Sequence, residues 1–170
     1  MLSERLLNAL NDQLKYEFDS SHLYLSMAAY CASQDFDGFA HFFRIQAEEE
    51  RFHAMKFFDF IHAKGSNVVI KGVEEPSMQY DSILDAFEKA YEHEKSVTKR
   101  VYNLMDIATE EREHATISFL RWFVDEQVEE EASFDMIKKK IKRIKDDTNA
   151  LYMLDDELGN RTYTPPKEEN

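Results

Sequence analysis

Glu50 and His53 are the residues whose types and spacing point most directly to chemistry. They lie three positions apart in a strongly helical stretch, so they share one face of a helix. That face is otherwise apolar, with Phe43 seven residues before Glu50 and Phe57 seven residues after it. A carboxylate and an imidazole in an apolar stripe need a partner, and a divalent metal ion is one. A buried histidine hydrogen-bonded to the glutamate explains the same motif without a metal.

Three other helical segments also carry one glutamate within an apolar stripe, at Glu17, Glu94 and Glu130. The stripe around Glu94 reads Ile83, Phe87, Ala90, Glu94, Val97, Val101, Met105. Each glutamate lies near the middle of its helix, so the four carboxylates are expected at one level inside a bundle. One such glutamate alone is readily explained by a snorkelling side chain or an arginine partner. Four of them, all in mid-helix, favour a shared site.

Charge indicates what such a site would hold. Ionised carboxylates repel one another in a low-dielectric interior, and without a cation some of them must take up protons. Two divalent cations neutralise four carboxylates, and His53 adds a nitrogen ligand. This donor set predicts a dinuclear site suited to iron or manganese, to which zinc would also bind.

The elements that position these residues are helices. The chain has 170 residues with only 4 Gly and 3 Pro, which favours one all-helical domain. Helices are predicted over about residues 3–32, 38–64, 82–109, 111–142 and 149–158. The predicted signals are Ser3, Asp37 and Thr109 as N-terminal caps and Gly65 as a terminator. We assign residues 1–160 to the domain and 161–170 to a polar, frayed tail.

The long segment 66–81 determines the topology. Sixteen extended residues reach about 50 Å, whereas a helix as long as the second is about 40 Å. The segment can therefore cross the whole bundle, so that the third helix starts at the end where the second began. This is the one-crossover topology of ferritin-like bundles. The last helix is too short to be stable alone, so its apolar residues need a partner surface on the same bundle or on another subunit.

Composition excludes several classes of partner. A net charge of −13 argues against nucleic acids and anionic membranes and favours cations. No apolar run is long enough for a transmembrane helix, and the first residues lack the apolar core of a signal peptide. The single cysteine, Cys31, suits a reducing cytoplasm.

Several motifs together resemble the prokaryotic non-haem ferritins along nearly the whole chain. They are Glu17 with Tyr24, Glu50-Arg51-Phe52-His53, Tyr91-Glu92-His93-Glu94, Glu126-Gln127-Val128-Glu129-Glu130-Glu131, the crossover, and the final helix 151–158. The resemblance implies a ferroxidase centre with two iron sites. One is similar to a site of Glu17, Glu50 and His53, and the other to one of Glu50, Glu94 and Glu130, with Gln127 close by.

The family also has a third iron site beside the pair, and the matching residues here are Glu49, Glu126 and Glu129, with Glu130 shared. From spacing alone the first three are a solvated acidic face. Tyr24 matches a tyrosine that hydrogen-bonds beside the family's centre, although a core tyrosine is an equal reading of the sequence.

Haem is not expected, because Arg51 stands where bacterioferritins carry the haem-binding methionine. Gln127 and Glu130 also replace their second Glu-x-x-His motif.

The activity implied by the resemblance is oxidation of Fe²⁺ by O₂ or peroxide, followed by storage of a ferric mineral in a cage of twenty-four identical subunits. Iron access is expected near Glu110, Glu111 and Glu113 by analogy. The alternative is a di-iron oxidase or peroxidase of the same superfamily that stores no mineral. A purely structural bundle that binds no metal is a further alternative.

Overall fold

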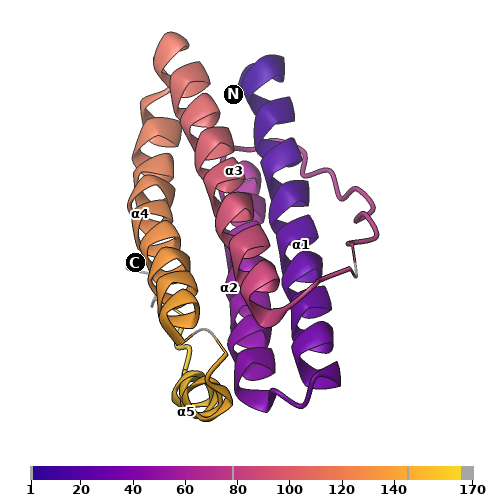
Figure 1. The fold of residues 1–170 in the computed structure, drawn as a ribbon. Coiled ribbons are helices and arrows are strands. Elements are labelled where there is room, and N and C mark those ends of the chain that lie inside the picture. The colour runs from indigo at the N-terminus through magenta and orange to yellow at the C-terminus, as the bar shows by residue number, and fades with distance from the viewer. Residues whose placement is uncertain (1, 78, 145, 166–170) are drawn as a thin grey trace.

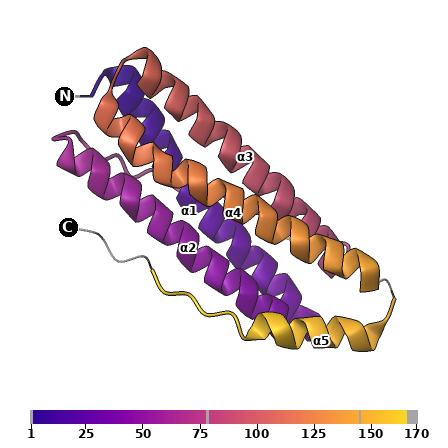
Figure 2. The same cartoon turned by 90° about the vertical axis from the view of Figure 1, so that its left-hand side faces the viewer.

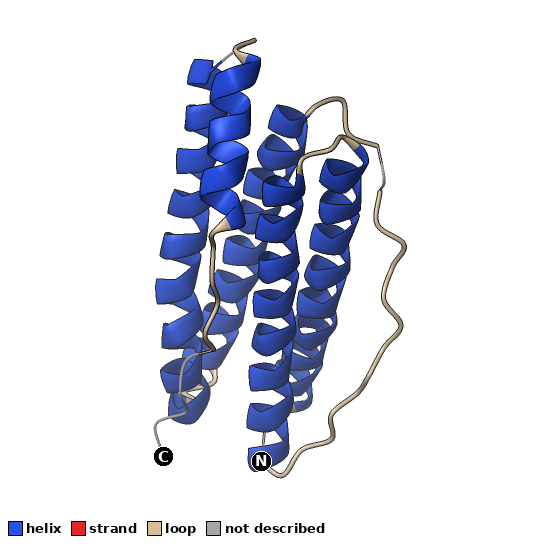
Figure 3. Cartoon of the chain, turned by 90° about the horizontal axis from the view of Figure 1, so that it is seen from below, coloured by secondary structure: helices blue, strands red, loops and turns tan. Residues whose placement is uncertain are grey.

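Helices form all the regular structure in the residues described by this computed structural model, which are 2–77, 79–144 and 146–165 (Figure 3). They are α1 (Glu4–Ser33), α2 (Asp37–Ala63), α3 (Ile83–Glu110), α4 (His114–Ile144) and α5 (Thr148–Gly159). The four long helices lie side by side as a bundle, and α5 lies at one end of it (Figure 1). The predicted all-α bundle with a short fifth helix is confirmed.

The predicted crossover is also present. The connection between α2 and α3 leaves one end of the bundle, runs along the outside of α1 and reaches the opposite end, so α2 and α3 are parallel (Figure 1). Side chains of α1 hold it in place. Asn11 Oδ1 accepts a hydrogen bond from Val69 N over 2.7 Å, and Asp19 Oδ1 accepts one from Glu74 N over 3.0 Å.

Local sequence explains most helix ends. Ser3 Oγ accepts from Leu6 N at 3.0 Å and Ser82 Oγ from Asp85 N at 3.0 Å, which satisfies backbone donors in the first turns of α1 and α3. Gly65 follows α2 with a φ of 65°, a conformation that glycine adopts without strain. The predicted roles of Ser3 and Gly65 are confirmed.

Two predicted caps are wrong. Thr109 does not start the fourth helix, because α3 continues to Glu110 and the chain turns over residues 111–113. Glu113 caps α4 instead, accepting from Thr116 N at 2.8 Å. Asp37 is already the first residue of α2 and makes no cap, whereas Asp155 of α5 accepts from Phe39 N at 2.7 Å. The start of α4 is thus capped by another local residue, whereas a contact distant in sequence satisfies the start of α2.

The core consists of two apolar clusters separated by a polar layer. Tyr24, Phe43 and Phe134 belong to one cluster, and Leu14 and Phe57 to the other. Each long helix passes from one cluster to the other, and its central glutamate or glutamine lies between them. All residues of the predicted α3 stripe are buried except Met105, which is partly exposed, while the adjacent Leu104 is buried.

The short helix α5 packs on the start of α2. A Cβ atom built on Gly38 would lie 1.8 Å from the backbone oxygen of Asp155, so only glycine allows this approach. Leu154 is buried against the bundle, whereas Tyr152 and Met153 are 48% and 74% exposed. The predicted need for a partner surface is therefore met partly by the same chain. Across the described residues, none of the helices has the length and apolar character needed to cross a membrane.

Candidate metal centre

The structure brings Glu17, Glu50 and His53 together inside the bundle. Each offers one ligand atom, and these atoms all lie within 4.8 Å of one another. The three residues are 0%, 1% and 3% exposed. Glu17 comes from α1 and the other two from one face of α2. The geometry is that of a buried site with two carboxylates and one imidazole.

Two oxygens in this cluster have no hydrogen-bond partner. Among the described residues, Glu17 Oε2 and Glu50 Oε2 are the only buried side-chain oxygen or nitrogen atoms without a hydrogen-bond partner. His53 Nδ1 lies 3.5 Å from Glu50 Oε2, too far for a good hydrogen bond. Burial, and then repulsion from Glu50, raises the pKa of Glu17 well above its usual value. Unsatisfied buried carboxylate oxygens are the groups that a cation would stabilise.

Glu94 and Glu130 complete the polar layer from α3 and α4. Gln127 Nε2 donates to Glu94 Oε2 over 3.0 Å, and the Tyr24 hydroxyl donates to the other oxygen of Glu94. Burial raises the pKa of Glu130, and repulsion from Glu94 and Glu50 raises it further. The four central glutamates are thus all buried in one polar layer, in which Tyr24 and Gln127 are hydrogen-bonded to Glu94. Their assignment as a metal-binding set stays a prediction.

Two glutamines of the site were missed by sequence reasoning. Gln13 Nε2 donates to Glu17 Oε1 at 2.8 Å, and Gln46 Nε2 donates to Glu130 Oε2 at 2.9 Å and to Glu50 Oε1 at 3.3 Å. Both are fully buried. A sequence signal was available, because each glutamine lies four residues before a buried glutamate, which places the pair on one helix face.

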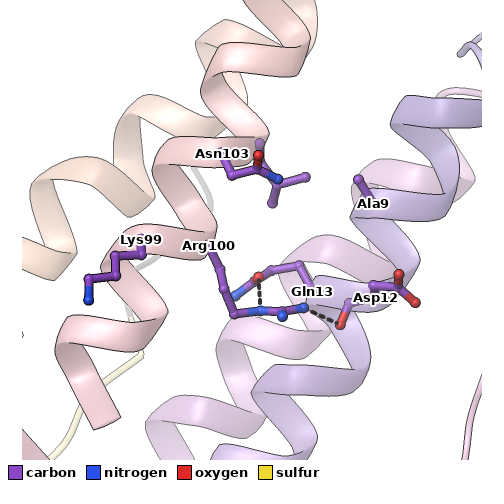
Figure 4. Close-up of a pocket in the computed structure, with 7 residues that line it drawn as sticks. Ala9, Asp12, Gln13, Lys99, Arg100 and Asn103 are labelled. Atoms are coloured by element: carbon purple, nitrogen blue, oxygen red, sulfur yellow. Dashed lines mark hydrogen bonds between the residues drawn. The ribbon is translucent and has the colours of Figure 1, made fainter. Parts of the chain in front are cut away.

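Arg100 of α3 extends this arrangement towards the surface. Its Nε donates to Gln13 Oε1 over 3.0 Å, and a second guanidinium nitrogen lies 3.2 Å from Asp12 O (Figure 4). These residues line a cavity of about 310 Å³ between α1 and α3, together with Ala9, Lys99 and Asn103. Arg100 therefore fixes the amide orientation that lets Gln13 donate to Glu17.

Aromatic rings surround the centre. Trp122 packs edge-on against the His53 ring at 5.3 Å between centroids. His93 packs edge-on against Tyr24 at 5.8 Å and stacks on Tyr16 at 5.4 Å, while its Nε2 lies 2.7 Å from Ser20 Oγ. Burial lowers the pKa of His93 to about 4. His93 is therefore neutral near pH 7 and adds no positive charge beside the carboxylates.

The residues matched to a third iron site lie on one side of this layer. Glu49 is largely buried, Glu126 is partly buried and Glu129 is exposed. Burial raises the pKa of Glu126, and repulsion from Glu129 contributes to the increase. Arg161, which the sequence placed in a frayed tail, forms an ion pair with Glu49. Residues 166–170 of that tail lie outside the described residues.

Two of the acidic residues expected at an access route have partners in the same chain. Glu113 forms an ion pair of 2.8 Å with Lys64 as well as capping α4. Glu110 pairs with Arg5 at 2.7 Å. Two of the three carboxylates are thus engaged within the chain.

Comparison with known proteins agrees with this architecture. The ferritin-like domain family matches residues 7–144. A bacterial non-heme ferritin of Staphylococcus aureus (strain MRSA252) is 48% identical over 163 residues, which cover 96% of this chain and 98% of that protein. A bacterial non-heme ferritin of Staphylococcus epidermidis is 44% identical with the same coverage.

Solved structures show the same fold. An engineered closed form of the Archaeoglobus fulgidus ferritin superposes with a TM-score of 0.95 at 48% identity, covering 96% of this chain and all of that one. The open-pore ferritin from the same archaeon gives 0.94 at 48% identity over 95% of this chain. The chain therefore belongs to the ferritin-like family, as the resemblance of its motifs to prokaryotic non-haem ferritins predicted.

Proposed function

We propose that this protein stores iron and oxidises Fe²⁺ at a dinuclear centre in the polar layer. The observation that carries the proposal is the buried cluster of Glu17, Glu50 and His53, in which two carboxylate oxygens have no partner. Oxygen and imidazole donors suit Fe²⁺. The curated relatives are named non-heme ferritins, which supports a role with iron and without haem.

Two Fe²⁺ ions would be held as substrates at neighbouring positions. Glu17 and His53 would bind the first, Glu94 and Glu130 the second, and Glu50, which lies between these groups, would bridge them. Their four carboxylates balance the charge of two divalent ions, so the pair can lie in a buried layer. Gln127 would stay near the second ion, and Tyr24 would orient Glu94 through its hydroxyl.

Holding two ions together suits the chemistry of O₂. Each Fe²⁺ gives one electron, so the pair reduces O₂ by two electrons, and with two protons the products are two Fe³⁺ and one H₂O₂. Peroxide would serve as an oxidant in the same way, with water as the product. The apolar clusters on both sides of the layer exclude bulk water, which strengthens electrostatic interactions within it.

Passage of Fe³⁺ out of the centre would use the carboxylates of Glu49, Glu126 and Glu129, with Glu130 shared. Glu49 and Glu126 are partly buried and Glu129 is exposed, which suits a route from the buried layer to solvent. The ferric product would be stored as a mineral in a cytoplasmic cage of twenty-four chains. In that cage the exposed Tyr152 and Met153 of α5 would be covered by neighbouring subunits.

The test is aerobic addition of Fe²⁺ to the metal-free protein, followed by size-exclusion chromatography with iron and protein detection. We expect iron to co-elute with a large assembly in much greater amounts than its binding sites can hold. About two irons per chain on a small oligomer would instead indicate a di-iron oxidase or peroxidase that stores no mineral.

The centre itself is tested by His53→Ala. Loss of one ligand should slow the initial oxidation rate at least about tenfold in stopped-flow absorbance, as removal of groups at metal sites does. His22→Ala is the control, because His22 is exposed on α1. An unchanged rate in His53→Ala would contradict the assigned site.

A further inference from the structure

The chain after α5 turns back and runs along α2 (Figure 2). Arg161 makes the contacts that hold it there. Its backbone oxygen lies 2.8 Å from His41 Nε2, and its guanidinium lies 4.3 Å from the centre of the Phe42 ring. This C-terminal segment, residues 160–165, is thus anchored to the first half of α2.

The guanidinium also reaches the surroundings of the candidate centre. It donates to Gln46 Oε1 over 3.0 Å and forms the ion pair with Glu49. The side chains of Arg161 and Glu49 are 22% and 14% exposed, so the pair is largely shielded from water. Because Gln46 donates in turn to Glu130, one cation is connected to both the dinuclear layer and the third-site carboxylates.

The positive charge of Arg161 lies beside a carboxylate that is proposed to bind metal. Burial raises the pKa of Glu49, and Arg161 and His53 act against that rise by stabilising the carboxylate. Arg161 contacts one oxygen of this carboxylate, Oε2, and a divalent ion at the third site would bind the same carboxylate group. Two cations held at one carboxylate repel each other strongly in a partly desolvated site. Arg161 therefore supplies at Glu49 the positive charge that a bound metal ion would supply.

Beyond Arg161 the segment is loosely packed. A cavity of about 440 Å³ separates Tyr163 and Pro165 from the α2 residues Glu48, Arg51 and Met55. Moving the segment away from α2 would open this space without disrupting the buried core. The restraints on the segment are the contacts of Arg161 with His41, Phe42, Gln46 and Glu49, and a competing cation at Glu49 would break the last of these.

We propose that Arg161 competes with divalent cations for Glu49, so that metal binding at the third site releases residues 160–165 from α2. This inference rests on the proposed function, because it takes Glu49 as an iron ligand. It gives the C-terminal segment a role in the order of loading: the dinuclear pair fills first, and the third ion binds only by displacing Arg161.

Anaerobic calorimetric titration of the metal-free protein with Zn²⁺ tests the competition. In Arg161→Gln we expect the two tight ions per chain to bind as in the wild type and a third to bind roughly fivefold more tightly, the effect of removing a modest ion pair. Arg161→Lys, which keeps the charge, should resemble the wild type. Arg44→Gln removes the same charge from an exposed position of α2 and is the control.

Hydrogen exchange provides a second measurement. Amides of residues 160–164 should exchange faster when zinc exceeds two ions per chain, and not before. A third ion that binds equally or less tightly in Arg161→Gln would overturn the inference, because a purely structural Arg161 predicts that result. Unchanged exchange would also overturn it. Absence of the tight pair would contradict the proposed function and the inference with it.

Discussion

Gln13 and Glu17 lie one turn apart on α1 and are joined by a buried hydrogen bond of 2.8 Å. The bond engages one oxygen of Glu17, whereas the other has no partner, and Glu17 lies in the cluster with Glu50 and His53. Arg100 fixes Gln13 from the other side. Glu17, a proposed ligand, is thus oriented by a residue outside the proposed ligand set, a common arrangement at metal sites.

Gln13→Leu should therefore weaken divalent metal binding while preserving the fold. Leucine is similar in size but cannot donate to Glu17, so the carboxylate loses its fixed orientation. We expect about 10- to 100-fold weaker binding of the first Zn²⁺ in anaerobic calorimetry. Gln34→Leu, at an exposed position after α1, is the control. Equal affinities in the two variants would show that Gln13 does not position the ligand.

Metal binding should also stabilise the protein. The metal-free layer holds four buried carboxylates whose pKa values are all raised by burial. Zinc at one hundred times its dissociation constant should add about 2.7 kcal/mol. For a chain of this size that corresponds to a melting temperature roughly 5–10 °C higher. Scanning calorimetry checks the shift. It should largely disappear in His53→Ala, and its absence from the wild type would contradict a preformed site.

Gly38→Ala should displace α5. The new Cβ would overlap the backbone oxygen of Asp155, which lies 1.8 Å from its position, so backbone rather than a flexible side chain must move. We expect a loss of about 1–3 kcal/mol in the free energy of unfolding, measured by urea denaturation. Gly72→Ala is a matched control, because its Cβ would meet no atom within 4 Å. Equal stability of the two variants would be inconsistent with the close packing of α5.

Glu113 should contribute stability that depends on pH. Its hydrogen bonds with Lys64 and then Thr116 lower its pKa to about 2. Because the folded-state pKa lies below the unfolded one, the contribution is complete above about pH 4.5 and is lost as the pH falls towards 2. Glu113→Ala should cost about 1 kcal/mol at pH 7 through loss of the cap alone.

Urea denaturation of wild type and Glu113→Ala between pH 7 and pH 3.5 measures this dependence. The difference between the two proteins should begin to narrow below about pH 4.5. Glu75→Ala, at an exposed position of the crossover, should show no such trend. A difference for Glu113→Ala that stays constant with pH would mean that its ionised form adds no stability.

The fold and the central glutamates were predictable because helix periodicity is a strong signal. Each central glutamate interrupts a stripe spaced by three and four residues, and burial of the stripe follows from that spacing. The boundary between α3 and α4 was not predictable, because no glycine or proline marks it. Glu113 caps α4 with help from Lys64 of α2, and such a long-range contact leaves no local pattern.

The surroundings of the candidate centre were harder to predict than the burial of its glutamates. Arg161 lies in a polar, proline-containing stretch that is typical of a disordered end, yet it contacts Glu49 and Gln46 about 110 residues earlier. Nothing in the local sequence indicates that contact. A residue that positions a side chain of a different helix can be identified only from the packed structure.

The crossover also has a consequence for how the molecule reaches its native state. It divides the chain into two helical hairpins, α1–α2 and α3–α4. The first supplies Glu17, Glu50 and His53, and the second supplies Glu94, Gln127 and Glu130. We expect contacts within a hairpin, which are closer in sequence, to form before the two halves meet. On that order the polar layer is completed last, and a metal ion would act on the docking of two preformed halves.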